Sequence, residues 1–105
     1  MHSPDVLATV TLLPTSEGGK KTSVRSGYRP DHRIREDYLT CGIHRYIDKE
    51  RVNPGQTVRT EISFIDPKAY PHCLWVGKIV TIQEGVRIVG HADILAVYNP
   101  ILKAP

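Results

Sequence analysis

Hydrophobic and polar residues alternate most regularly along residues 57–65 (TVRTEISFI). Such alternation is the period of a β-strand that buries one face and leaves the other in water. The side chains that fall on the less polar face are Val58, Thr60, Ile62 and Phe64. We therefore predict a strand here, with these four residues pointing into the core.

Five further segments are rich in β-branched and apolar residues and end at turn-forming residues. Four of them are residues 6–13 (VLATVTLL), 38–47 (YLTCGIHRYI), 73–82 (CLWVGKIVTI) and 86–97 (VRIVGHADILAV), and the fifth, residues 31–37 (DHRIRED), is an exception in composition because it is mostly charged. The apolar segment 73–82 is predicted to be a central strand, and segments 73–82 and 86–97 are predicted to form a hairpin through Glu84 and Gly85.

Two of these strands carry specific expectations. Residues 31–37 are heavily charged, so this strand should lie at a sheet edge or face solvent on both sides. In residues 38–47, the alternation places Leu39, Cys41 and Ile43 inward, with Tyr46 or Ile47 continuing that face. Gly42 indicates a β-bulge that shifts the register midway.

Turn signals separate the strands, and no segment shows a convincing helical period. Asn53, Pro54 and Gly55 form the clearest turn, because proline presets φ at one central position and glycine accepts positive φ at the next. Six strands joined by such turns favour an all-β barrel or sandwich. We predict a single domain over residues 1–98 and a tail or attachment point over residues 99–105.

Positive charge is concentrated between residues 20 and 35, in a glycine-bearing stretch that follows the first strand. This stretch has a net charge of +5, although the whole chain carries only +3. Its basic residues are Lys20, Lys21, Arg25, Arg29, Arg33 and Arg35, and its only acid is Asp31. Such a basic lobe should attract phosphates or an acidic protein surface, although a solvated loop would show the same composition.

Length and cysteine content restrict the class of protein. A chain of 105 residues is large enough for one core and too small for a nucleotide-binding domain plus a second domain. Two cysteines are too few for a disulfide framework, which favours a reducing compartment and a cytoplasmic location. The apolar run at residues 6–13 is preceded by no basic residue, so it is interpreted as a strand and not as a signal peptide. No window is apolar for long enough to span a bilayer, and no membrane partner is expected.

The candidate chemical motifs are weak. Gly19, Lys20, Lys21 and Thr22 fail to match a phosphate-binding loop, so we expect neither nucleotide binding nor hydrolysis. The spacing of the zinc-ligand candidates Cys41, His44, His72 and Cys73 matches no known finger or ribbon, so we expect no cofactor and no metal. Cys41 and His44 would leave a strand on opposite faces, so no nucleophilic pair is visible and no enzyme activity is expected.

Four motifs together resemble the C-terminal β-barrel domain of the elongation factor Tu family, here as a free-standing chain. They are EGGKKT, SGYRP, NPGQ and IQEGVRIVG, in this order and at nearly the family's spacing over residues 3–98. The resemblance implies a six-stranded antiparallel β-barrel. In the intact factor this barrel packs on a second barrel and a GTPase domain and helps to hold the backbone of the acceptor and T-stem of aminoacyl-tRNA.

The departures from the family pattern concern its RNA contacts. Asp31 stands where the family has a glutamine near the tRNA backbone, and a carboxylate there would repel phosphate. Thr40 corresponds loosely to the threonine of the family's Thr-Gly pair, because one residue is inserted here. Glu84 matches the glutamate of the family's EGG turn, and Arg87 is its expected neighbour on the exposed hairpin.

Two functions of different classes follow from these observations. The first is a non-catalytic module that binds RNA weakly, or binds a translation component or another acidic protein surface. The residues expected to contact this partner are Lys20, Lys21, Arg25, Tyr28, Arg29, Asp31, Arg33, Arg35, Thr40, Glu84 and Arg87. The second is a protein-interaction domain without RNA binding, anchored by Tyr28 or Trp75. Tyr28 is expected to seal the barrel end in preference to stacking on a base.

Overall fold

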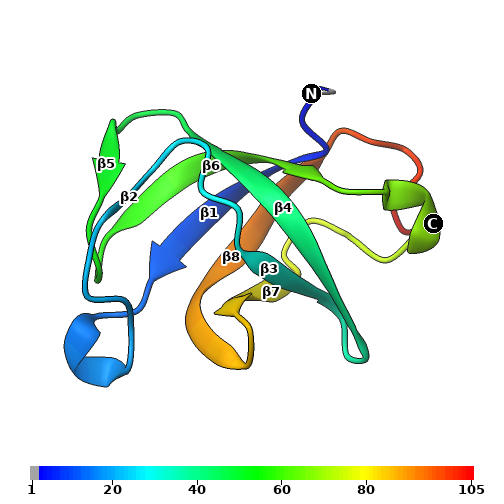
Figure 1. The fold of residues 1–105 in the computed structure, drawn as a ribbon. Helices are drawn as coiled ribbons and strands as arrows, with labels where there is room; N and C mark the ends of the chain where they lie inside the picture. The colour runs from blue at the N-terminus through cyan, green and yellow to red at the C-terminus, as the bar shows by residue number, and fades with distance from the viewer. Residues whose placement is uncertain (1–2) are drawn as a thin grey trace.

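The computed structural model describes residues 3–105 and shows an all-β protein whose main sheet closes into a six-stranded barrel. Neighbouring strands are antiparallel in the order β1-β6-β4-β3-β7-β8, and β8 pairs back onto β1 (Figure 1). The strands are β1 (Val6–Leu12), β3 (Asp31–Arg35), β4 (Tyr38–Tyr46), β6 (Thr57–Phe64), β7 (Ile79–Glu84) and β8 (Arg87–Val97). This architecture confirms the predicted barrel.

Short elements complete the chain. A two-stranded ribbon forms between β2 (Val24–Arg25) and β5 (Arg51–Val52) at one end of the barrel (Figure 1). The helical turns η1 (Thr15–Glu17) and η2 (Pro67–Ala69) are each one 3-10 turn. Within residues 3–105, no helix has the length and apolar character needed to cross a membrane.

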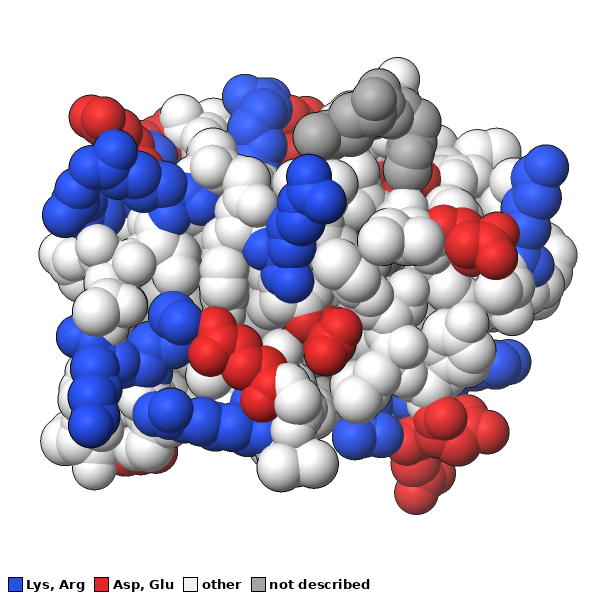
Figure 2. Space-filling view, viewed as in Figure 1, with Lys and Arg blue, Asp and Glu red and all other residues white. Residues whose placement is uncertain are grey.

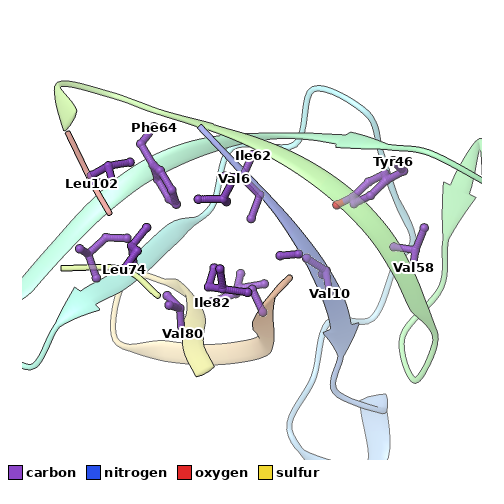
Figure 3. Packing of buried hydrophobic residues seen from close by; sticks show 14 of the residues in the cluster. Val6, Val10, Tyr46, Val58, Ile62, Phe64, Leu74, Val80, Ile82 and Leu102 are labelled. Atoms are coloured by element: carbon purple, nitrogen blue, oxygen red, sulfur yellow. The ribbon is translucent and has the colours of Figure 1, made fainter. Parts of the chain in front are cut away.

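The core follows the alternation of the strands. The inward set predicted for β6 is confirmed, because Val58, Thr60, Ile62 and Phe64 are all buried. On β1, every second residue from Val6 to Leu12 is buried in the same way. Figure 3 shows Val6 and Val10 of β1 and Val58, Ile62 and Phe64 of β6 converging with Val80 and Ile82 of β7 in the barrel interior.

The inward face predicted for β4 is wrong at Leu39, Cys41 and Ile43, whereas Tyr46, one of the two alternatives for its continuation, is buried. The structure buries Thr40, Gly42, His44 and Tyr46, whereas Leu39 is 38% exposed and Cys41 and Ile43 are half-buried on the outer side. The polar set can face inward because His44 finds hydrogen-bond partners inside the barrel, in His32 and Tyr46.

Gly42 forms no bulge, because residues 42–46 pair with β6 without interruption. It is instead a point of close packing, where an added Cβ would lie 2.7 Å from His32 Cε1 and 2.9 Å from Ile62 Cγ2. The register irregularity lies on the other side of β4, between Arg33 and Arg35 of β3.

Two further strand predictions need correction. The segment 31–37 is not an edge, since β3 lies between β4 and β7 and buries His32 and Ile34. The strand predicted from residue 73 begins only at Ile79, because Gly77 adopts a φ of 94° in a turn that precedes it.

The segment after β8 is no loose tail. Leu102 is fully buried, and its carbonyl accepts a hydrogen bond of 2.9 Å from the amide of Leu74. The buried Asp5 carboxylate joins this segment to the barrel, since it accepts hydrogen bonds from the Asn99 side chain at 2.8 Å and the Phe64 amide at 2.7 Å. Residues 99–105 therefore belong to the folded unit.

The packing around Gly42 gives a first testable prediction. Gly42→Ala should lower the free energy of unfolding by about 1 to 3 kcal/mol, because the new methyl group overpacks the interior next to His32. Urea denaturation of the purified variant measures this loss. Cys41→Ala, one residue away on the outer side, is the control and should cost less than about 1 kcal/mol. Equal losses in the two variants would contradict the observed orientation of β4.

Candidate binding surface

The structure divides the predicted basic residues between the two ends of the barrel. Lys20, Lys21 and Arg25 lie in the η1–β2 connection and on β2, whereas Arg33 and Arg35 lie on β3, toward the β3–β4 hairpin at the opposite end (Figure 1). Figure 2 shows Lys and Arg side chains gathered at the end that carries β2, β5 and η1. The six residues therefore do not form one lobe.

Glu84 holds the basic loop on the β7–β8 hairpin. Its Oε2 atom accepts hydrogen bonds of 2.6 Å from both Lys20 Nζ and the Tyr28 hydroxyl. The hydrogen bond from Lys20, followed by that from Tyr28, holds the pKa of the Glu84 carboxyl below its usual value. Burial, with the Glu84 carboxylate next, raises the pKa of Tyr28.

Arg87, on the β8 side of the hairpin, also binds the loop at residues 18–20. Its guanidinium donates to the carbonyl oxygens of Gly18 and Gly19, the first at 3.2 Å. Glu84 and Arg87 are also paired in register across the turn. We call this arrangement, from Glu84 and Arg87 to residues 18–20 and Tyr28, the hairpin clamp. It assigns a structural role to four of the residues that we predicted to contact a partner.

Tyr28 lies half-buried and packs against the core cluster, as expected for a residue that closes the barrel end. Its ring stands edge-on to His44, with 5.7 Å between ring centroids, and Lys20 Nζ lies 5.3 Å from its centroid. The ring therefore contacts two side chains within the molecule.

Three other candidates also have partners inside the molecule. Arg33 donates to Gln83 Oε1 at 3.1 Å and to the Glu36 carbonyl at 2.7 Å. Arg35 lies over the Tyr38 ring, 5.7 Å from its centroid. Thr40 is buried, and its hydroxyl is 3.1 Å from the Tyr70 hydroxyl.

The remaining basic candidates, Lys21, Arg25 and Arg29, are exposed. The structure adds Arg51, which lies directly opposite Arg25 in the β2–β5 ribbon. No carboxylate within residues 3–105 forms a salt bridge with any of these four side chains. We name Lys21, Arg25 and Arg51 the basic edge. Sequence reasoning missed Arg51 because neither two-residue strand of the ribbon has a detectable period.

A shallow groove runs beside residues 26–29, on the outer side of β4 and β6. It consists of two hollows of about 320 and 430 Å³ that share Ile43 and Ser63. Ser26 and Gly27 line the first hollow, and Arg29 lines the second. Asp31, the predicted repulsive residue, is half-buried on β3 between Cys41 and Gln83.

Apolar side chains are exposed next to the turn that precedes β7. Trp75 is 51% exposed, and Val76 and Ile79 are more exposed still. Lys78 Nζ lies 4.6 Å from the Trp75 ring centroid and donates to the carbonyls of Ile34 and Cys73. Trp75 is thus a surface residue next to a turn that Lys78 supports.

The Cys and His side chains weighed as metal ligands do not converge. His44 points into the barrel, whereas Cys41 lies half-buried on its outer side. Among residues 3–105, no three His, Cys, Asp or Glu side chains gather in a position to hold a metal ion. No protein-family model matches the sequence.

The hairpin clamp predicts a change in proteolysis. Glu84→Gln should speed limited trypsin cleavage after Lys20 and Lys21 about fivefold, because losing a partly exposed ion pair lowers the free energy of loop opening by about 1 kcal/mol. Glu61→Gln is the matched control, since Glu61 pairs with Arg45 on the barrel wall. Cleavage at the same rate in both variants would show that Glu84 does not hold the loop.

Proposed function

We propose that the chain is a non-catalytic binding module of the elongation factor Tu C-terminal type, which binds the phosphodiester backbone of RNA through its basic edge. The observation that carries this proposal is the pairing of Arg25 with Arg51 across a two-residue ribbon. Like charges directly opposite each other in a sheet are destabilising. A bound phosphate would offset that repulsion and accept hydrogen bonds from both guanidinium groups.

The character of the edge supports weak binding that is independent of sequence. A phosphate contact carries no information about the base, and the edge offers cations without an aromatic platform that is free of other contacts, since Tyr28 is held by Glu84. Counterion release would supply most of the affinity, so binding should be strongest at low salt. The hairpin clamp supports this function indirectly, because it fixes the loop that precedes β2.

The resemblance to the translation factor supports the choice of RNA over other polyanions. The GYRP and EGxRxVG elements, which carry much of the resemblance, meet at the hairpin clamp through Tyr28, Glu84 and Arg87. Both cysteines are unpaired, which fits the reducing cytoplasm in which such a module would meet RNA.

A second candidate function is protein binding through the exposed turn around Trp75. Exposed aromatic and aliphatic side chains in one place are typical of interaction surfaces, and tryptophan is enriched among the residues that anchor them. Such an interface would depend on Trp75 and Ile79 and would have only modest salt sensitivity.

The RNA proposal predicts a specific salt dependence. A tRNA acceptor and T-stem minihelix should bind at low salt, and log K should fall linearly with log salt concentration. Arg25→Ala and Arg51→Ala should each reduce the slope by about one, because each removes one phosphate contact. Fluorescence anisotropy across a salt series measures these slopes.

Arg59→Ala is the matched control for these variants. Arg59 is exposed and pairs with Asp48, so its removal changes the net charge equally and should leave the slope unchanged. No binding at low salt, or equal effects of all three substitutions, would refute the RNA proposal. RNA bound in the family's manner would instead respond to Asp31→Gln, which should tighten binding. Loss of protein partners in Trp75→Ala alone would favour the second candidate.

A further inference from the structure

Two fully buried histidines face each other inside the barrel. His32 comes from β3 and His44 from β4, and their Nε2 atoms are 2.8 Å apart. His44 Nδ1 lies 3.0 Å from the Tyr46 hydroxyl, and His32 Nδ1 lies 3.4 Å from the Thr40 carbonyl oxygen. The four groups form one chain of hydrogen bonds across the interior.

The Thr40 carbonyl fixes the direction of this chain, because a carbonyl can only accept. His32 must therefore carry its proton on Nδ1, which makes Nε2 of the neutral ring an acceptor. His44 then donates from Nε2, and its Nδ1 accepts from the Tyr46 hydroxyl. Every ring nitrogen has a partner while both imidazoles are neutral, so a proton can be added to either ring only by changing this pattern of hydrogen bonds.

Adding protons disrupts the chain. A proton on His32 Nε2 forces His44 to reverse its tautomer, and it leaves the Tyr46 hydroxyl proton without the acceptor that it had. A second proton would set two N–H donors against each other across the 2.8 Å gap. The first proton therefore reverses the direction of the hydrogen-bond chain, and the second breaks the His32–His44 hydrogen bond.

In the part of the chain that the structure describes, the side chains that contact the two rings carry no negative charge. The titratable groups that face the pair are Tyr28, on the segment before β3, and Tyr46, on β4. The facing side chains of β6 and β7 are apolar: Phe64 lies edge-on to His32 at 5.3 Å, Ile62 pairs with His44, and Ile82 pairs with His32. No carboxylate is among the residues that these contacts bring to the two rings, so a buried imidazolium would lack a partner.

The pH range follows from the same burial. Burial lowers the pKa of His32 to about 4, and burial together with the adjacent His32 lowers the pKa of His44 well below its ordinary value. Imidazoles in the unfolded chain titrate near 6.5, so below that pH the unfolded state binds more protons than the folded state. The stability contributed by the neutral pair is complete above about pH 6.5 and declines as the pH falls toward 4.

We propose that the His32–His44 pair is an acid-sensitive latch, which holds residues 26–30 against β4 at neutral pH and releases them when it is protonated. The backbone of His44 joins residues 26–30 to β4. Its carbonyl accepts a hydrogen bond of 2.8 Å from the Gly27 amide, and its amide donates one of 2.9 Å to the Tyr28 carbonyl. The ring of Tyr28 rests on His44 from the same side. Opening would move the segment that connects Arg25 to Arg29. The latch does not depend on the identity of the partner.

Urea denaturation between pH 7.5 and 5.0 tests the latch in a range where carboxylates remain ionised. Each proton taken up on unfolding raises the unfolding equilibrium constant tenfold per pH unit, so the native chain should show a rise approaching roughly 100-fold per unit below pH 6. In His32→Gln, which has lost one of the two titrating imidazoles, the unfolding equilibrium constant should rise only about tenfold per pH unit. His91→Gln, a partly exposed histidine on β8, is the matched control and should keep the native profile. A rise below tenfold per unit in the native chain, or equal profiles in the two variants, would overturn the proposal.

A second measurement requires no variant and remains decisive if His32→Gln fails to fold. Nitrogen-15 NMR of the native chain at pH 7.5 should find His32 protonated on Nδ1 and His44 on Nε2, both neutral. Amide hydrogen exchange, corrected for intrinsic rates, should show protection of Gly27 and His44 falling at pH 5.5 before that of β1. A charged ring at neutral pH, or simultaneous loss of protection across the barrel, would contradict the latch.

Discussion

Closure of the sheet by β8 is the constraint on which the rest of the structure depends. This strand pairs with β7 along one side and with β1 along the other, so the six-stranded sheet has no open edge. Gly90 makes the crossing possible, because any Cβ at that position would lie 2.4 Å from the Thr11 carbonyl oxygen. The same hairpin places Glu84 and Arg87 against the loop that follows β1. The barrel thereby fixes residues 18–20, which directly precede Lys21 of the basic edge.

The fold could be predicted because most strands obey a simple burial pattern. Residues 57–64 alternate cleanly, the proline and glycine turns lie between strands, and no segment competes as a helix. Sequence reasoning failed on β4 for a physical reason: its buried positions are occupied by Thr40, Gly42, His44 and Tyr46, while Ile43 faces outward. Polar residues can occupy an interior when they form hydrogen bonds with one another. Here that hydrogen bond joins His32 of β3 to His44 of β4. Alternation within one segment cannot reveal such a pair.

The composition of the basic surface could be predicted from the sequence, but its arrangement could not. The cluster of cations in residues 20–35 is evident from the sequence, but its distribution over two barrel ends depends on where β3 enters the sheet. Lys20 and Arg33 have internal partners in Glu84 and Gln83, each about fifty or more positions away along the chain. Arg51 joins the surface from a segment that showed only turn signals. The single basic lobe that we predicted is therefore replaced by a smaller basic edge, which follows the loop that the hairpin clamp holds.

Mapping the RNA contact by NMR tests the central claim most directly. Amide chemical shifts of the isotope-labelled chain would be followed while the tRNA acceptor and T-stem minihelix is added at low salt. The account predicts that the perturbed amides fall in residues 20–29 and 49–53, the two segments that carry Lys21, Arg25 and Arg51. Perturbations confined to residues 33–36 or to the Trp75 turn would contradict it, because they would place the partner at a different part of the barrel surface.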